Sequence, residues 1–66
     1  MANFKILKRP DVQAMTGLSR SSIYAMMDNG SFPKQINLGA RSVGWLDHEV
    51  QEWLEGRVLA SRGGVI

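Results

Sequence analysis

The fold is decided by residues 10–30, which read PDVQAMTGLSRSSIYAMMDNG. Pro10 suits the first turn of a helix, because the N–H group that it lacks would have no partner within the helix. Gly17 can take the left-handed conformation that ends a helix, and Ser19 is a good N-cap for a second one. Gly30 then supplies another stop signal. Two short helices joined by a tight turn that contains glycine predict a helix-turn-helix.

The second of these helices is amphipathic. At about 100° per residue, Ile23, Met26 and Met27 lie on one side, whereas Ser21 lies on the opposite side. Leu18, just before the cap, and Ile23 have the spacing of a hydrophobic staple, which fixes the angle at which the chain enters the helix. Because helices this short are marginal alone, we expect the apolar side to be held by packing.

Residues 32–46 predict a β-hairpin. Ile36 and Leu38 alternate with polar residues, which is the period of a strand with one buried face. Residues 39–42 supply the turn, and the chain then returns through a second short strand. Arg41 is therefore expected at the tip of the hairpin.

A third helix is expected from Asp47, which can cap it. One stripe of this helix is apolar and should dock on the first two helices. The stripe consists of Val50, Trp53, Leu54 and Val58. The order of elements predicts a mostly α fold with a small β-hairpin: a winged helix-turn-helix with a two-stranded wing and a C-terminal helix. This domain should span residues 1–60, followed by a flexible C-terminal tail at residues 61–66.

Length and composition narrow the class of protein. The 66 residues suffice for one domain, and 44% hydrophobic residues indicate a folded core. No cysteine is present, so neither a disulfide nor a thiolate metal site is predicted, which fits a reducing cytoplasm. The longest apolar run, residues 23–27, is far shorter than the roughly 20 residues that cross a bilayer. We therefore expect a cytoplasmic protein without a membrane segment, and we expect no cofactor.

Charges are unevenly distributed along the chain. Residues 1–46 carry six lysines and arginines against two aspartates, whereas residues 47–66 carry two arginines against four carboxylates. One part of the protein should therefore face a polyanion and another should not. Lys5, Lys8 and Arg9 precede the first helix, where they either contact phosphate or serve only as solubilising charges.

Six residues form the candidate DNA-binding set. A helix that enters the major groove meets base edges with its N-terminal residues and phosphates with its flanks. The set comprises Ser19, Arg20, Ser21 and Tyr24 of the second helix and Lys34 and Arg41 of the hairpin. The helix N-terminus favours a phosphate near Ser19, and the hairpin cations would follow the backbone or the minor groove. The alternative interpretation is a solvated helix start followed by an ordinary charged turn.

The other aromatic residues and the single histidine indicate no further site. Phe32, Trp45 and Trp53 could stack on bases, but each occupies a position where the pattern predicts the core. His48 lacks the second histidine or cysteine that would complete a metal site, so it is expected at the surface. No phosphate-binding loop, carboxylate pair or nucleophile with its base is recognisable. The sequence therefore predicts that the protein is not an enzyme.

Four motifs follow one another in a characteristic order. They are PDV (residues 10–12), TGLSRSSIY (16–24), GSFPK (30–34) and LGARSVGW (38–45). Over about residues 4–58, the chain thereby resembles the AlpA family of small phage and prophage regulators, which is similar to excisionases and to MerR-type DNA-binding domains. The resemblance implies a winged helix-turn-helix in which residues 19–24 open the recognition helix and the wing carries Arg41. It also implies control of prophage transcription, or assistance to an integrase during excision.

This chain departs from the family pattern at four positions. Ala25 stands where many relatives have a basic residue, and Gln35 and Ala40 stand where relatives tend to have proline. Arg9 replaces a residue that is usually apolar. The sequence preference of the family therefore cannot be carried over, and this wing should be less rigid.

The leading prediction is a sequence-specific double-stranded DNA-binding regulator of a prophage or mobile element. Because a single module of this kind buries only about 600–1,000 Å² on DNA, we expect self-association, cooperative binding or a partner. One alternative is an excisionase-type accessory factor. Another is a protein-interaction module that uses the same helix pair to bind an integrase or RNA polymerase, with little or no DNA binding. Its main support is the acidic third helix, where Glu49, Glu52 and Glu55 point away from the core. An RNA binder is less favoured, because exposed aromatic platforms on a sheet are not predicted.

Overall fold

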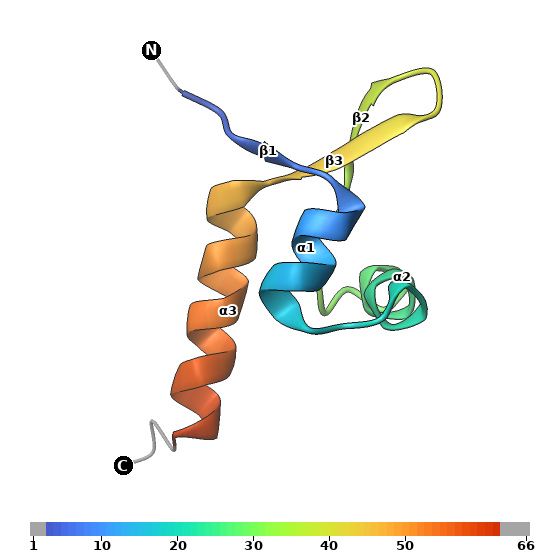
Figure 1. The fold of residues 1–66 in the computed structure, drawn as a ribbon. Coiled ribbons are helices and arrows are strands. Elements are labelled where there is room, and N and C mark those ends of the chain that lie inside the picture. The colour runs from blue at the N-terminus through green and yellow to red at the C-terminus, as the bar shows by residue number, and fades with distance from the viewer. Residues whose placement is uncertain (1–2, 63–66) are drawn as a thin grey trace.

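A computed structural model describes residues 3–62 of the chain. The elements are β1 (Ile6–Leu7), α1 (Arg9–Thr16), α2 (Arg20–Asp28), β2 (Ile36–Gly39), β3 (Ser42–Leu46) and α3 (Asp47–Ser61). Figure 1 shows α1 in the middle of the molecule, with α3 on one side of it and α2 on the other. The described part of the chain is thus mostly helical with a small antiparallel sheet.

Helix α1 begins and ends where the sequence predicts. Pro10 lies in its first turn, and the carboxylate of Asp11 accepts a hydrogen bond from the backbone N–H of Lys8 at 3.2 Å. Gly17 ends the helix with a φ of 74°, in the left-handed region that glycine adopts without strain. Residues 17–19 alone connect α1 to α2, so the predicted arrangement of two helices and a tight turn is confirmed.

Both ends of α2 are fixed by local signals. The Oγ atom of Ser19 accepts a hydrogen bond from the backbone N–H of Ser22 at 3.1 Å, as predicted for an N-cap. Gly30 has a φ of 82°, and its N–H donates to the carbonyl of Met27 at 3.2 Å. The N–H of Ser31 donates to the carbonyl of Met26 at 2.8 Å. This pair of bonds is a Schellman motif, which satisfies the last carbonyls of the helix.

The sheet has three strands in the order β1-β3-β2, not the two strands that the sequence predicts. β1 pairs antiparallel with β3, with Ile6 opposite Leu46 and Leu7 opposite Trp45. Gly44 makes this close approach feasible, because a Cβ atom at this position would lie 2.5 Å from Cγ2 of Ile6 and 2.9 Å from the carbonyl oxygen of Leu7. The short apolar segment before α1, Ile6–Leu7, is therefore the third strand.

The β2–β3 hairpin closes through a two-residue turn. Gly39 pairs with Ser42, which leaves Ala40 and Arg41 at the tip. Arg41 has a φ of 61°, although it is not a glycine. A non-glycine residue in this region costs about 1–2 kcal/mol, so the tip is strained around its basic residue. The predicted position of Arg41 at the tip is confirmed.

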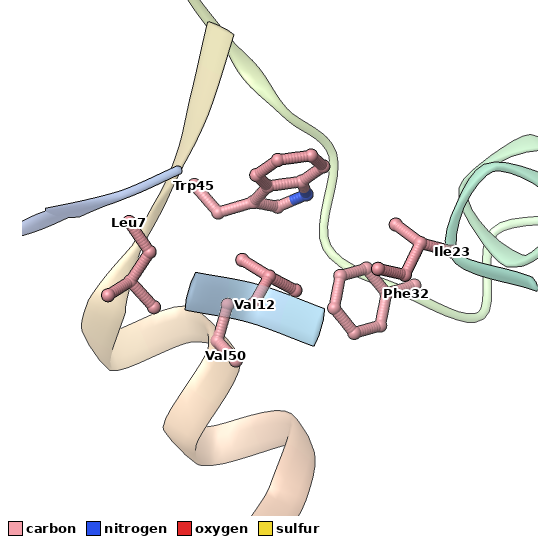
Figure 2. Packing of buried hydrophobic residues seen from close by; sticks show 6 residues of the cluster. All are labelled: Leu7, Val12, Ile23, Phe32, Trp45 and Val50. Atoms are coloured by element: carbon pink, nitrogen blue, oxygen red, sulfur yellow. The ribbon is translucent and has the colours of Figure 1, made fainter. Parts of the chain in front are cut away.

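The hydrophobic core lies where α1 meets the sheet and the other two helices (Figure 2). It consists of Leu7, Val12, Ile23, Phe32, Trp45 and Val50. Figure 2 shows Val12 in the centre, with Trp45 above it and Ile23 and Phe32 together at one end. The indole N–H of Trp45 donates to the carbonyl of Pro33 at 3.1 Å, so this buried ring leaves no polar atom unpaired.

Helix α3 differs from its prediction at both ends. Its N-cap is Leu46 with no side-chain cap bond, because β3 runs directly into the helix and Asp47 is already helical. Val58 is 47% exposed and not docked, because α3 has 15 residues and α1 only eight, so α3 extends about 10 Å further. The helix also includes Ser61, the first residue of the predicted tail, and residues 63–66 lie outside the described residues. None of the described helices is both long and apolar enough to cross a membrane.

Candidate nucleic-acid interface

The start of α2 exposes a polar and basic surface. Ser19, Arg20 and Ser21 are exposed, and the cap holds the first turn in a fixed conformation. The guanidinium carbon of Arg20 lies 5.7 Å from the centroid of the Tyr24 ring, which is half-buried. This cation–π contact positions the arginine along the flank of the helix. The N–H groups at the edge of its planar guanidinium remain able to donate hydrogen bonds. The first turn of α2 can therefore present a positive charge at a preset position.

Lys34 lies beside α2 although it follows the helix in the chain. It lines a shallow depression together with Tyr24, Ala25, Met27 and Asp28. Tyr24 is thus near both cations of this side: Arg20 lies over its ring, and Lys34 lines the same depression. Asp28 places one carboxylate at the C-terminal end of the same surface, so its positive charge is concentrated toward the start of the helix. A polyanion meeting this side of α2 would be attracted most strongly there.

Arg41 lies apart from this group, at the turn of the β2–β3 hairpin. Figure 1 shows the hairpin turn projecting beyond the body of the protein, on the side of α1 opposite to α3. Arg41 is exposed, and within residues 3–62 neither a hydrogen bond nor a cation–π contact joins it to α2. The structure therefore groups Ser19, Arg20, Ser21, Tyr24 and Lys34 along α2 and leaves Arg41 as a separate, outlying charge.

Lys8 was a less specific candidate, and the structure gives it a place. Its Nζ atom donates to the Oγ atom of Ser42 at 3.0 Å, which brings a second cation to the base of the hairpin turn next to Arg41. No sequence signal could have paired residues 34 positions apart. Arg9, by contrast, is half-buried and donates to the side chain of Gln13 at 3.3 Å, so its guanidinium is engaged within α1.

The other candidates lie where the sequence predicts. Trp45 and Phe32 are buried, and Trp53 is half-buried with its indole N–H donating to the carbonyl of Ser31 at 2.6 Å. Phe32 and Trp53 also contact edge to face, with ring centroids 4.8 Å apart. These rings belong to the core and its rim, so the prediction that they occupy core positions is confirmed. His48 is exposed, and no cluster of metal-ligating side chains occurs in residues 3–62.

Two helices in tandem, the second of them capped and with an arginine in its first turn, define a small protein of the helix-turn-helix type. The family model described as "Prophage CP4-57 regulatory protein (AlpA)" matches residues 5–58, which is most of the chain. The chain belongs to this AlpA family, as its four motifs predict.

Two relatives illustrate the range of the family. "Uncharacterized protein ORF88" of Enterobacteria phage P4 is 42% identical over 60 residues, which covers 91% of this chain and 68% of the relative. "DNA-binding transcriptional activator AlpA" of Escherichia coli (strain K12) is 39% identical over 59 residues, which covers 80% of this chain and 84% of the relative. The similarity therefore extends over most of each protein.

Proposed function

We propose that this protein is a sequence-specific double-stranded DNA-binding regulator of a prophage or mobile element, which acts without catalysis. The observation that carries the proposal is the exposed, capped start of α2, where Arg20 and Ser21 face solvent. Membership of the AlpA family supports it, as does a relative described as a DNA-binding transcriptional activator.

In the proposed complex, α2 is the recognition helix in the major groove. Arg20 reaches a guanine edge or a phosphate, and Ser21 adds a hydrogen-bonding hydroxyl. The N–H groups of the first turn and the helix dipole hold a phosphate near Ser19. Tyr24 orients Arg20 through the ring contact and turns its hydroxyl toward the backbone, while Lys34 neutralises a phosphate on the other flank.

The β2–β3 hairpin is the wing in this proposal. Its turn carries Arg41, and Lys8 is held at the base of the turn by Ser42. These two charges contact the phosphate backbone or the adjacent minor groove beside the major groove that α2 occupies. Arg41 is exposed at the tip, so its guanidinium is accessible for such a contact.

The test compares two arginines that lie on opposite sides of α1. Arg20 belongs to the proposed interface, whereas Arg57 lies on α3 with its guanidinium carbon 5.3 Å from the centroid of the Trp53 ring. Binding to the gene's own upstream duplex and to sheared duplex is measured across a salt series for the wild type, Arg20→Ala and Arg57→Ala. Circular dichroism of each variant checks that the fold is retained.

For the wild type we expect about three or four phosphate contacts, hence a slope of log K against log salt near −3 to −4, with tighter binding to the upstream duplex. Arg20→Ala should weaken binding by about 1–3 kcal/mol: it flattens the slope by about one if Arg20 binds a phosphate, or relaxes base preference if it reads a guanine. Arg57→Ala should behave as the wild type. Salt-independent or absent binding to every duplex would overturn the proposal and favour the protein-interaction module.

A further inference from the structure

The surface that α3 leaves uncovered has a definite shape and composition. An open groove runs between α1 and the C-terminal half of α3, lined by Met15 of α1 and by Gln51, Leu54, Glu55, Val58 and Leu59 of α3. Its apolar members are unusually exposed: Leu59 is 63% exposed, Val58 47% and Met15 37%. In a domain of this size each exposed aliphatic side chain forgoes burial that the fold could use.

The groove continues along α3 to its last residues. Leu54 and Val58 also line a second depression, together with Arg57, Ser61 and Arg62. Positions 54, 55, 58, 59 and 62 are spaced three or four apart, so they share one face of the helix. We call this face the α3 stripe: Leu54, Glu55, Val58, Leu59 and Arg62. Val58 and Leu59 form its apolar centre, with Glu55 on the N-terminal side and Arg62 on the C-terminal side.

We propose that the α3 stripe binds the α3 stripe of a second copy of this chain, with the two helices antiparallel about a two-fold axis that passes between Val58 and Leu59. In this arrangement Val58 of each copy packs on Leu59 of the other. Glu55 of each copy faces Arg62 of the other, so one axis produces two ion pairs.

The charge pattern itself selects this occupant and this direction. A two-fold interface must be self-complementary, because the same patch supplies both sides. Glu55 and Arg62 lie at equal distances along the helix from the proposed axis, with opposite charges, which is the required pattern. A parallel pairing would instead place Glu55 against Glu55 and Arg62 against Arg62, and like charges in contact are unfavourable.

The interface is small, so the dimer is weak in solution. It comprises about two helical turns from each copy with Met15 at the edge of the groove, well below the roughly 800 Å² per partner of a standard interface. We expect a dissociation constant on the order of 0.1 mM. Two copies on neighbouring DNA sites experience a high effective concentration, where such a contact becomes cooperativity.

The stripe is also placed so that it does not compete with DNA. Figure 1 shows α3 and α2 on opposite sides of α1, so pairing through α3 leaves both copies of α2 uncovered. The self-association does not require DNA, whereas its use in cooperative binding rests on the proposed function. The two-fold axis then implies inverted half-sites in the target.

The test is sedimentation equilibrium without DNA, at low ionic strength, up to millimolar protein. Glu55→Arg and Arg62→Glu should each weaken the dimer about tenfold, because each places two like pairs in contact. An equimolar mixture of the two variants should recover the wild-type dissociation constant, since every pair in the mixed dimer is again of opposite charge. Glu52→Arg, an exposed charge reversal on α3 that lies one turn before Glu55 and so beyond the paired residues 55–62, is the matched control and should behave as the wild type. Leu59→Lys should abolish association.

A wild-type protein that stays monomeric at millimolar concentration overturns the inference. So does an unchanged dimer in Glu55→Arg and Arg62→Glu, or a mixture that is no tighter than either variant alone. Binding to a duplex with a single site distinguishes this failure from failure of the proposed function. Glu55→Arg should weaken this DNA binding no more than Glu52→Arg does. Arg20→Ala should weaken the DNA binding and leave the dimer intact.

Discussion

Helices α2 and α3 each bury an apolar residue in the core, yet they meet solvent in opposite ways. In α2 the apolar residue Ile23 is fully buried, and the residues turned outward at its start are polar or basic. In α3 Val50 is fully buried, but Val58 and Leu59, further along the helix, are about half exposed or more. Helix α2 packs its main apolar residue in the core, whereas α3 carries more apolar residues than the core can cover.

The cause of this difference is length. α2 has nine residues and ends in its Schellman motif, whereas α3 has 15 and extends beyond α1. A short helix in a small domain can thus use every apolar residue for stability and every polar one for binding. A longer helix on the same scaffold exposes an apolar surface that lies outside the core. We propose this surface for self-association.

The largest difference between the two helices is expected when one apolar residue in each is truncated to alanine. Ile23→Ala leaves a cavity in the core and should lower the free energy of unfolding by about 2–5 kcal/mol. Val58→Ala should change it by less than about 0.5 kcal/mol, because the side chain is half exposed and alanine favours the helix. Urea denaturation at micromolar protein, where the chain is monomeric, measures both. Equal losses would show that α3 is covered along its whole length.

A second pair of variants compares two glycines. Gly44→Ala should lower the free energy of unfolding by about 1–3 kcal/mol, because its Cβ atom would meet Ile6 and the backbone of Leu7. Gly56→Ala in α3 should raise it by about 0.5–1 kcal/mol, because no atom lies within 4 Å of its Cβ position and alanine is the better helix former. Thermal unfolding of the two variants gives the sign directly. A neutral Gly44→Ala would mean that β1 does not approach β3 so closely.

The smallest expected effect concerns the helix starts. Ser19→Ala removes the cap of α2 and should cost about 1 kcal/mol. Asp47→Ala should cost only about 0.5 kcal/mol, because Asp47 does not cap α3 and contributes through the helix dipole and one exposed hydrogen bond from Gln51. Chemical denaturation compares the two losses. If Asp47→Ala proved the more damaging, its side-chain contact with Gln51, at 2.8 Å, would carry more energy than the cap of α2.

Elements with local signals were predictable from the sequence. The stop at Gly17, the cap at Ser19 and the turn at Arg41 depend on residues next to them in the chain, and the structure places all three as predicted. The exposure of Arg20 and Ser21 follows from the same local pattern. Their contact with DNA stays a prediction, because the chain is described without a ligand.

Features that depend on distant segments were not predictable. A two-residue strand has no period, so β1 could be found only through its partner β3. The exposure of Val58 depends on where α1 ends, and the position of Lys34 beside Tyr24 depends on how the chain returns along α2. The sequence predicts Asp47 as a cap, because aspartate is a common N-cap residue. In the structure Asp47 is the first residue of the helix, because β3 continues directly into α3.

The pairing of β1 with β3 also bears on how the chain folds. The helices, their turn and the hairpin form from residues close in sequence, but β1 must find β3 after all of them are in place, and closing so long a loop carries an entropic cost. We therefore expect this contact to form late and to open first. The N–H of Asp47, which donates to the carbonyl of Lys5 at 2.9 Å, should accordingly exchange with solvent faster than the N–H groups within α1. The strand that completes the sheet is then the weakest closure of the fold, and we expect it to open in local fluctuations that leave the helices folded.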